Sequence, residues 1–218
     1  MEGIFSPVGL LTLGILIYSA ILHEIAHGYV AERLGDPTAR LMGRLTLNPK
    51  PHIDPFLSII LPLLLLLSNS GVIFGGAKPV PVDPFNLKDG RKDIALVSLA
   101  GPATNIVLVL IATLIYKLFG LGGLQMTTVG LIASIVTATI IKVNLSLAIF
   151  NLLPIPPLDG SKVFSLLLPE KIADTYLSFG SVGTLILLLL IMFPIGGFSL
   201  MSVVSNLYLF SLSLLGLS

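Results

Sequence analysis

Residues 8–30 read VGLLTLGILIYSAILHEIAHGYV, and this stretch decides the fold class. Residues 8–22 carry no charged side chain, and a helix of about 20 mostly apolar residues is long enough to cross a lipid bilayer. No basic segment precedes the stretch, which favours a mature helix over a cleaved signal peptide. Four further stretches meet the same criterion: residues 94–118, 127–153, 175–193 and 198–217. We therefore expect an all-α polytopic membrane protein.

The composition of all 218 residues supports the same class. Mean hydropathy is +1.02 and only 11% of the side chains are charged, whereas soluble domains carry about 25%. The net charge of +1 offers no electrostatic basis for binding nucleic acid. Because the chain has no cysteine, disulfides and thiolate metal sites are excluded, and a metal would need His, Asp or Glu ligands.

A sixth apolar run, residues 56–70, is harder to interpret. As a helix it would cover about 22 Å, less than the ~30 Å hydrocarbon core, and Pro62 interrupts it. Basic residues flank it within 33–50 and 78–92, and the positive-inside rule places both groups in the cytoplasm. We therefore expect a re-entrant segment and five crossings of the cell membrane with the N-terminus outside. A sixth crossing is the alternative.

Two polar stretches between the first two long spans, residues 43–49 and 76–84, alternate β-forming residues with Pro and Gly. This pattern predicts edge strands of a short β-hairpin, or extended turns. An extended peptide could add to the backbone of residues 76–84 as a strand. We expect one membrane-embedded domain over residues 1–218, with its core at about 8–168 and two C-terminal spans at about 175–217.

The first span contains the pattern His-Glu-x-x-His at His23, Glu24 and His27. Histidines four residues apart lie on one face of a helix, about 6 Å apart along its axis, so both can reach one ion. Glu24 is turned roughly 100° from His23, where it can address a metal-bound water instead of the metal. Ionisable groups inside an apolar span are costly and indicate a functional site. The alternative is a pair of helix-packing histidines.

Asp159 is the strongest candidate for a third metal ligand. Catalytic zinc usually has three protein ligands and an open fourth position. Pro154, Pro156 and Pro157 cannot belong to a continuous helix, so the span over residues 127–153 must break here into extended backbone. Asp159 then falls where a helix can restart, pointing inward. The alternative is an N-cap aspartate at the membrane surface.

Together, the pattern of residues 23–27 and Asn151-x-x-Pro-x-Pro-Pro-Leu-Asp159-Gly resemble the site-2 protease family of intramembrane zinc metalloproteases. Gly101-Pro-Ala-Thr-Asn105 is similar to another recurrent segment of that family. The resemblance implies one zinc ion held by His23, His27 and Asp159, with Glu24 activating water. It also implies that the substrate is the transmembrane segment of a membrane protein, and we expect no PDZ or CBS domain.

Four further polar residues are candidates for supporting roles. Asn151 could bind the oxyanion or the substrate backbone, or it could join two helices. Asn105 has the same alternatives, and helix packing is the expected one. Asn144 lies two turns before Asn151 on the same face and could line a polar channel or pack. His52, just before the run at 56–70, could orient substrate or contact the metal site, or be a surface histidine.

Two other functions remain open at this stage. A transporter could use buried His, Glu and Asp side chains to carry protons or divalent ions. Transporters commonly repeat their broken helices in two halves, and we find one broken span, near Pro154, without a counterpart. A catalytically silent zinc-binding membrane protein is the third possibility, but Glu24 is present between the two histidines.

Overall fold

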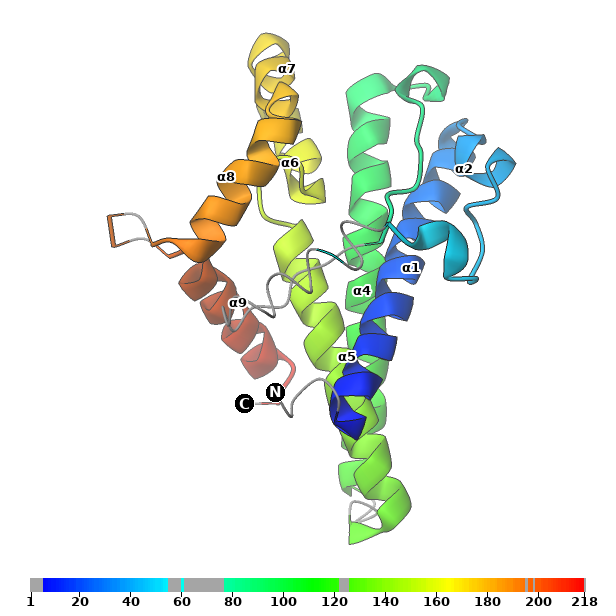
Figure 1. Cartoon of the computed structure of the whole chain (residues 1–218), viewed down its shortest axis with the longest axis vertical. Coiled ribbons are helices and arrows are strands. Elements are labelled where there is room, and N and C mark those ends of the chain that lie inside the picture. Colours follow the sequence, from blue (N-terminus) through cyan, green and yellow to red (C-terminus); the bar gives the residue numbers. More distant parts are fainter. Residues whose placement is uncertain are drawn as a thin grey trace.

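The computed structural model describes residues 6–54, 60, 77–121, 126–194, 196–197 and 199–217. Three long helices lie side by side in it: α1 (Pro7–Leu34), α4 (Gly90–Leu121) and α5 (Thr128–Asn151) (Figure 1). The other described helices are shorter. They are α2 (Thr38–Leu41), η1 (Lys50–His52), η3 (Pro84–Asn86), α6 (Asp159–Phe164) and η5 (Ser165–Leu167), followed by α7 (Glu170–Ser178), α8 (Gly180–Met192) and α9 (Leu200–Leu214).

The ends of α1 are set by local sequence. Ser6 caps the first turn, its hydroxyl accepting from the Gly9 amide at 3.0 Å, and Pro7 occupies the first helical position. The helix stops at Gly35, whose φ of +120° favours glycine. The chain then turns into a fully buried aspartate, Asp36.

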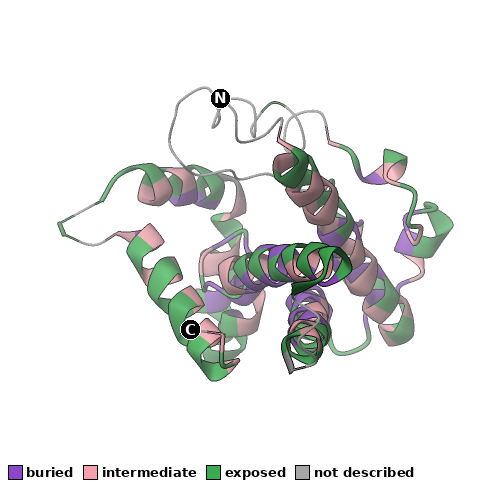
Figure 2. Cartoon of the chain, turned by 90° about the horizontal axis from the view of Figure 1, so that it is seen from below, coloured by how far each residue is buried: buried purple, intermediate pink, exposed green. Residues whose placement is uncertain are grey.

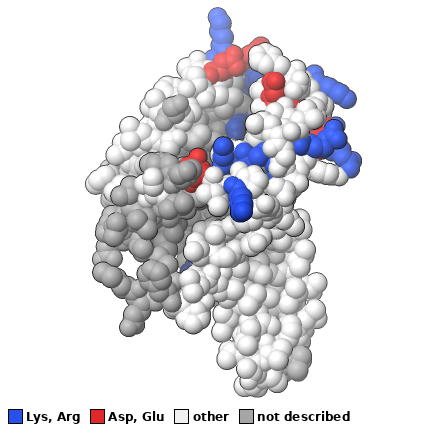
Figure 3. All heavy atoms as spheres, turned by 45° about the vertical axis from the view of Figure 1, so that its right-hand side comes forward, with Lys and Arg blue, Asp and Glu red and all other residues white. Residues whose placement is uncertain are grey.

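α4 is the central helix, since it packs against α1 and α5 and also against α6, η3 and η5. Seen end-on in Figure 2, buried residues gather where the long helices face one another and exposed residues lie on the outside. The outer face of α4 is apolar: Leu110, Ile111 and Leu114 are each more than half exposed. On the face shown in Figure 3, charged side chains gather at one end of the molecule, and the opposite end is uncharged. The apolar outer face of α4 and the uncharged end of the molecule suit contact with lipid.

The three long helices confirm the predicted helices at 8–30, 94–118 and 127–153, and each is long and apolar enough to cross a membrane. The prediction of five crossings is not confirmed, because the described residues hold three such helices, or four if α7 and α8 form one bent span. The 175–193 run is interrupted by a 69° bend between α7 and α8. The 198–217 run yields only the 15 residues of α9, about 22 Å. The run at 56–70 lies, apart from Ile60, outside the described residues.

The expected β-hairpin is likewise not confirmed, since the described residues contain no strand. Residues 43–49 form turns and bends, and residues 77–83 are extended without a partner strand. The backbone amides that could donate hydrogen bonds to a neighbouring strand donate to other groups instead. Lys78 donates to the His52 carbonyl, Val80 to the Glu24 side chain and Asp83 to the Asp36 side chain. Pro79 and Pro81 have no N–H to offer.

Asp36 fastens this extended segment to the end of α1. Its carboxylate accepts from the Asp83 amide at 2.7 Å, from the Asn86 side chain at 2.9 Å and from both the amide and hydroxyl of Thr38. Burial alone would raise the pKa of Asp36, but these hydrogen bonds outweigh it and lower the pKa below its usual value.

We expect Asp36→Ala to destabilise the detergent-solubilised protein by about 1–3 kcal/mol, because several donors lose a buried acceptor. The stabilisation is complete above the unfolded pKa of about 4 and is lost as the pH falls through the lower folded pKa. The difference in thermal midpoint between wild type and variant should therefore shrink on acidification. Asp89→Ala, which removes an exposed pair with Lys92, is the control, with an expected effect below about 1 kcal/mol. Equal effects of the two variants would contradict this role of Asp36.

Candidate metal centre

Three side chains from distant parts of the chain meet at one point. His23 and His27 lie one turn apart on α1, and Asp159 is the first residue of α6. Asp159 Oδ2 is 3.2 Å from His23 Nε2 and 3.2 Å from His27 Nε2. All three residues are buried, and one ligand atom from each lies within 4.8 Å of the others. The helix therefore restarts at Asp159 with its carboxylate facing the histidine pair.

Hydrogen bonds to the Nδ1 atoms of the two histidines fix the orientation of their imidazole rings. His23 Nδ1 is 2.6 Å from Asn105 Oδ1, and His27 Nδ1 is 2.6 Å from the Val97 carbonyl oxygen. Because both partners are oxygen acceptors, each Nδ1 carries the hydrogen and donates it. The Nε2 lone pairs then face Asp159, as in metal sites whose histidines are oriented by a second hydrogen bond. Two bare imidazole nitrogens and a carboxylate fit a zinc ion with an open fourth position.

Gly101 on α4 provides the room for this arrangement. A β-carbon added at Gly101 would lie 2.5 Å from both His23 Nε2 and His27 Nε2. Any side chain there would therefore overlap the two nitrogens that face Asp159. Gly101 precedes Asn105 by one helical turn, so one face of α4 supplies both the space beside the imidazoles and an acceptor for His23.

Glu24 lies beside this cluster at a cleft of about 400 Å³. Its Oε2 accepts a hydrogen bond from the Val80 amide at 2.7 Å. The cleft is also lined by His23, His27, Asp159, Val82 and Asn151. The carboxylate thus shares a cavity with the two histidines while an amide from the extended segment holds one of its oxygens.

Arg44 secures the extended segment on its other side. Its Nη2 donates to the Lys78 carbonyl at 2.6 Å and to the Pro79 carbonyl at 3.3 Å. Arg44 is itself buried. With Asp36 holding residue 83, the backbone around Val80 is fastened on both sides of the amide that binds Glu24.

The remaining predicted site residues occupy different places. Asn151 lines the cleft and donates from Nδ2 to the Leu147 carbonyl at 3.0 Å. Asn105 is fully buried behind His23, outside the lining of the cleft. His52 is buried and its Nε2 is 2.9 Å from the Thr46 carbonyl oxygen. It belongs neither to the cleft lining nor to the His-His-Asp group, and the surface position considered from the sequence is also wrong.

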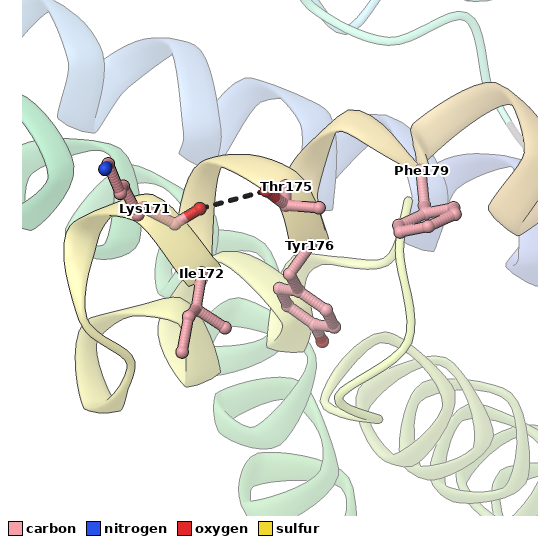
Figure 4. Close-up of a pocket in the computed structure, with 5 residues that line it drawn as sticks. All are labelled: Lys171, Ile172, Thr175, Tyr176 and Phe179. Atoms are coloured by element: carbon pink, nitrogen blue, oxygen red, sulfur yellow. Dashed lines mark hydrogen bonds between the residues drawn. The ribbon is translucent and has the colours of Figure 1, made fainter.

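A second hollow, of about 470 Å³, lies along α7. Figure 4 shows its five lining side chains, with the Thr175 hydroxyl donating to the Lys171 carbonyl at 3.0 Å. The lining contains no His, Asp or Glu. Because this hollow lacks the carboxylate and imidazole groups found at Glu24, we place the candidate site at the cleft.

Comparison with known proteins agrees with this geometry. Residues 120–194, which include Asp159, match the family model described as Peptidase family M50. The chain is 38% identical over 191 residues to "Putative zinc metalloprotease YwhC" of Bacillus subtilis (strain 168), covering 85% of this chain and 81% of that protein. The chain belongs to peptidase family M50. This confirms the resemblance to the site-2 protease family that the motifs at residues 23–27 and 151–160 indicated.

Further relatives match over a shorter stretch. Rip2 of Mycobacterium tuberculosis (strain H37Rv) and Rip2 of Mycolicibacterium smegmatis carry the same description as YwhC. They are 33% and 34% identical to the chain over 144 residues, which are 66% of this chain and 52% of each relative. No solved structure matches the chain significantly.

We expect Gly101→Ala to lower the zinc content of the purified M50 protein at least several-fold, because the new methyl group overlaps both Nε2 atoms. Zinc would be measured by elemental analysis after dialysis against a weak chelator. Gly14→Ala is the matched control, since a β-carbon at Gly14 on α1 meets nothing within 4 Å. Full zinc content in Gly101→Ala would show that the metal is not held at this point.

Proposed function

We propose that this M50 peptidase is an intramembrane zinc metalloendopeptidase that hydrolyses peptide bonds in or near the transmembrane segments of membrane-protein substrates. The observation that carries the proposal is the meeting of His23, His27 and Asp159 beside Glu24 in one cleft. The histidines and Glu24 belong to a helix that is long and apolar enough to cross a membrane. The zinc metalloprotease descriptions of the relatives support the same chemistry.

One zinc ion per chain would be held by His23 Nε2, His27 Nε2 and the Asp159 carboxylate. When bound, zinc lowers the pKa of water to around 7 and polarises a carbonyl. Asp159 Oδ2 faces the two histidines, and its Oδ1 is 3.2 Å from Lys162 Nζ. Lys162 therefore orients the carboxylate so that one oxygen remains directed at the imidazoles.

Glu24 would act as the general base and then as the general acid. One of its oxygens is occupied by the Val80 amide, which fixes the carboxylate plane and leaves the other oxygen to accept a proton from the attacking water. Glu24 then delivers that proton to the departing amine, because peptide hydrolysis must protonate the leaving nitrogen. Proton transfer of this kind contributes about 10²–10⁴-fold to the rate.

The substrate would lie along the extended backbone at Val80 and Val82, which lines the same cleft. Among the described residues the Val82 amide has no hydrogen-bond partner, so an unwound peptide could pair with it. Unwinding is necessary because a helix hides its peptide carbonyls in internal hydrogen bonds. Asn151, on the cleft wall, would donate to the substrate backbone or to the oxyanion.

The orientation in the membrane follows from charge. With the basic groups at 33–50 and 78–92 in the cytoplasm, the N-terminus lies outside the cell. The metal centre is near the end of α1 that carries these basic groups, since His27 is two turns from Leu34. We therefore place the cleft toward the cytoplasmic side of the cell membrane.

Substitution of the two carboxylates should separate metal binding from catalysis. In detergent, with a reporter substrate containing a spanning helix, Glu24→Gln should keep its zinc and lose cleavage by at least about 100-fold. Asp159→Ala should lose most of both zinc and cleavage, because a ligand is removed. Val82→Pro should keep zinc and cut more slowly, since it removes an amide that bonds to none of the described residues. Zinc content and product formation would be measured on the same preparations.

Glu32→Gln is the matched control, because Glu32 lies on the same helix but pairs with Arg40 at 2.7 Å, away from the cleft. It should retain both zinc and cleavage. Cleavage that survives in Glu24→Gln would contradict the assigned role of Glu24. Wild-type protein that binds zinc stoichiometrically but cuts no membrane substrate would favour a silent binding protein, and ion-coupled flux in liposomes would favour a transporter.

A further inference from the structure

A chain of buried hydrogen bonds runs behind the metal centre and joins the three long helices. From His23 on α1 it passes to Asn105 on α4, whose Nδ2 donates to Asn144 Oδ1 on α5 at 2.8 Å. Asn144 Nδ2 in turn donates to Ser19 Oγ on α1 and to the Ile140 carbonyl, each at 3.0 Å. Asn105 and Asn144 are both fully buried.

The direction of every bond in this chain follows from its last member. The Ile140 carbonyl can only accept, so the NH₂ group of Asn144 must face it and Asn144 Oδ1 must face Asn105. Asn105 therefore turns its NH₂ group toward Asn144 and its oxygen toward His23. His23 Nδ1 must then donate, which leaves the Nε2 lone pair bare on the side of Asp159.

The two histidines of the centre differ in how securely this tautomer is held. His27 donates to the Val97 backbone carbonyl, which has no alternative orientation to offer. His23 depends on the Asn105 side-chain amide, which could rotate by 180° and present NH₂ in place of oxygen. The acceptor supplied by Asn144 is what disfavours that rotation, because the rotated amide would set its oxygen against Asn144 Oδ1.

We propose that Asn144 is a positioning residue of the metal centre, which acts through Asn105 to hold His23 in the tautomer whose Nε2 binds metal. The inference rests on the proposed function, since it concerns the same zinc ligands. It goes beyond helix packing because it predicts that Asn144 and Asn105 affect the metal as one unit. Without Asn144, a rotated Asn105 would place the hydrogen of His23 on Nε2, where it excludes a metal ion.

A double-mutant cycle on zinc affinity tests the inference. Zinc dissociation constants would be measured by chelator competition on metal-stripped protein in detergent, for wild type, Asn105→Leu, Asn144→Leu and the double variant. Loss of an outer hydrogen bond to a metal-binding histidine typically weakens metal binding by about 10–100-fold. We expect losses of about tenfold or more for each single variant. The double variant should bind zinc no more than about threefold more weakly than the weaker-binding single variant. Asn144 acts only through Asn105, so its loss adds little once Asn105 is replaced.

Thr137→Val is the matched control. Thr137 is also a buried polar residue of α5, but its hydroxyl bonds to the Ala133 and Ser134 carbonyls within the same helix. The zinc affinity of the Thr137→Val variant should stay within about twofold of wild type. Thermal unfolding would be recorded for every variant, and Asn144→Ala would replace Asn144→Leu throughout the cycle if the leucine prevents folding.

A second readout follows the tautomer itself. The chain has three histidines, so ¹⁵N-histidine spectra of the zinc-loaded protein are simple to assign. The Nδ1–H signal of His23 should be slow to exchange in wild type and be lost or broadened in the Asn144 variant. Folded Asn144 variants with wild-type zinc affinity, or losses that multiply in the double variant, would overturn the inference alone. Wild-type protein that binds no zinc would overturn the proposed function as well.

Discussion

Two imidazoles can share one metal ion only if both turn a bare nitrogen to the same point, and the rest of this structure depends on that constraint. At His23 and His27 it is met by two acceptors on α4, the Asn105 side chain and the Val97 carbonyl, each 2.6 Å from an Nδ1 atom. Neither acceptor is a ligand, yet both determine which nitrogen is available. Gly101, between them on the same helix, leaves the space in which the ligand atoms meet.

This requirement explains why buried polar groups from several segments surround the metal centre. A buried imidazole, amide or carboxylate is unfavourable in an apolar environment unless it is hydrogen-bonded, and the partners must come from neighbouring segments. α4 and α5 supply Asn105 and Asn144, the proline-broken segment supplies Asp159, and the extended segment supplies the Val80 amide to Glu24. The hydrogen bonds that join these segments are therefore also the ones that position the candidate metal ligands and Glu24.

The sequence predicted the long helices and the histidine pair, because apolar length and a four-residue spacing are local properties. The meeting of Asp159 with the histidines could be expected from the paired motifs. The partners Val97 and Val80 could not, since they act through backbone atoms that leave no mark in the side-chain pattern. Gly101 was noted only as part of the segment Gly101–Asn105, and its contact with the two imidazoles was not predicted, although its spacing of one turn from Asn105 was a usable signal. The number of spans stays unconfirmed, because apolarity over 175–193 does not reveal the bend seen there and the run at 56–70 lies, apart from Ile60, outside the described residues.

The central claim is that zinc is bound by the imidazoles of His23 and His27 and the carboxylate of Asp159, and that the third histidine, His52, is not a ligand. X-ray absorption at the zinc edge, on purified protein loaded with one equivalent of zinc, tests this most directly. The account predicts two imidazole nitrogens together with oxygen donors, at about 2.0–2.2 Å. A spectrum with one imidazole or none, or with three, would contradict it.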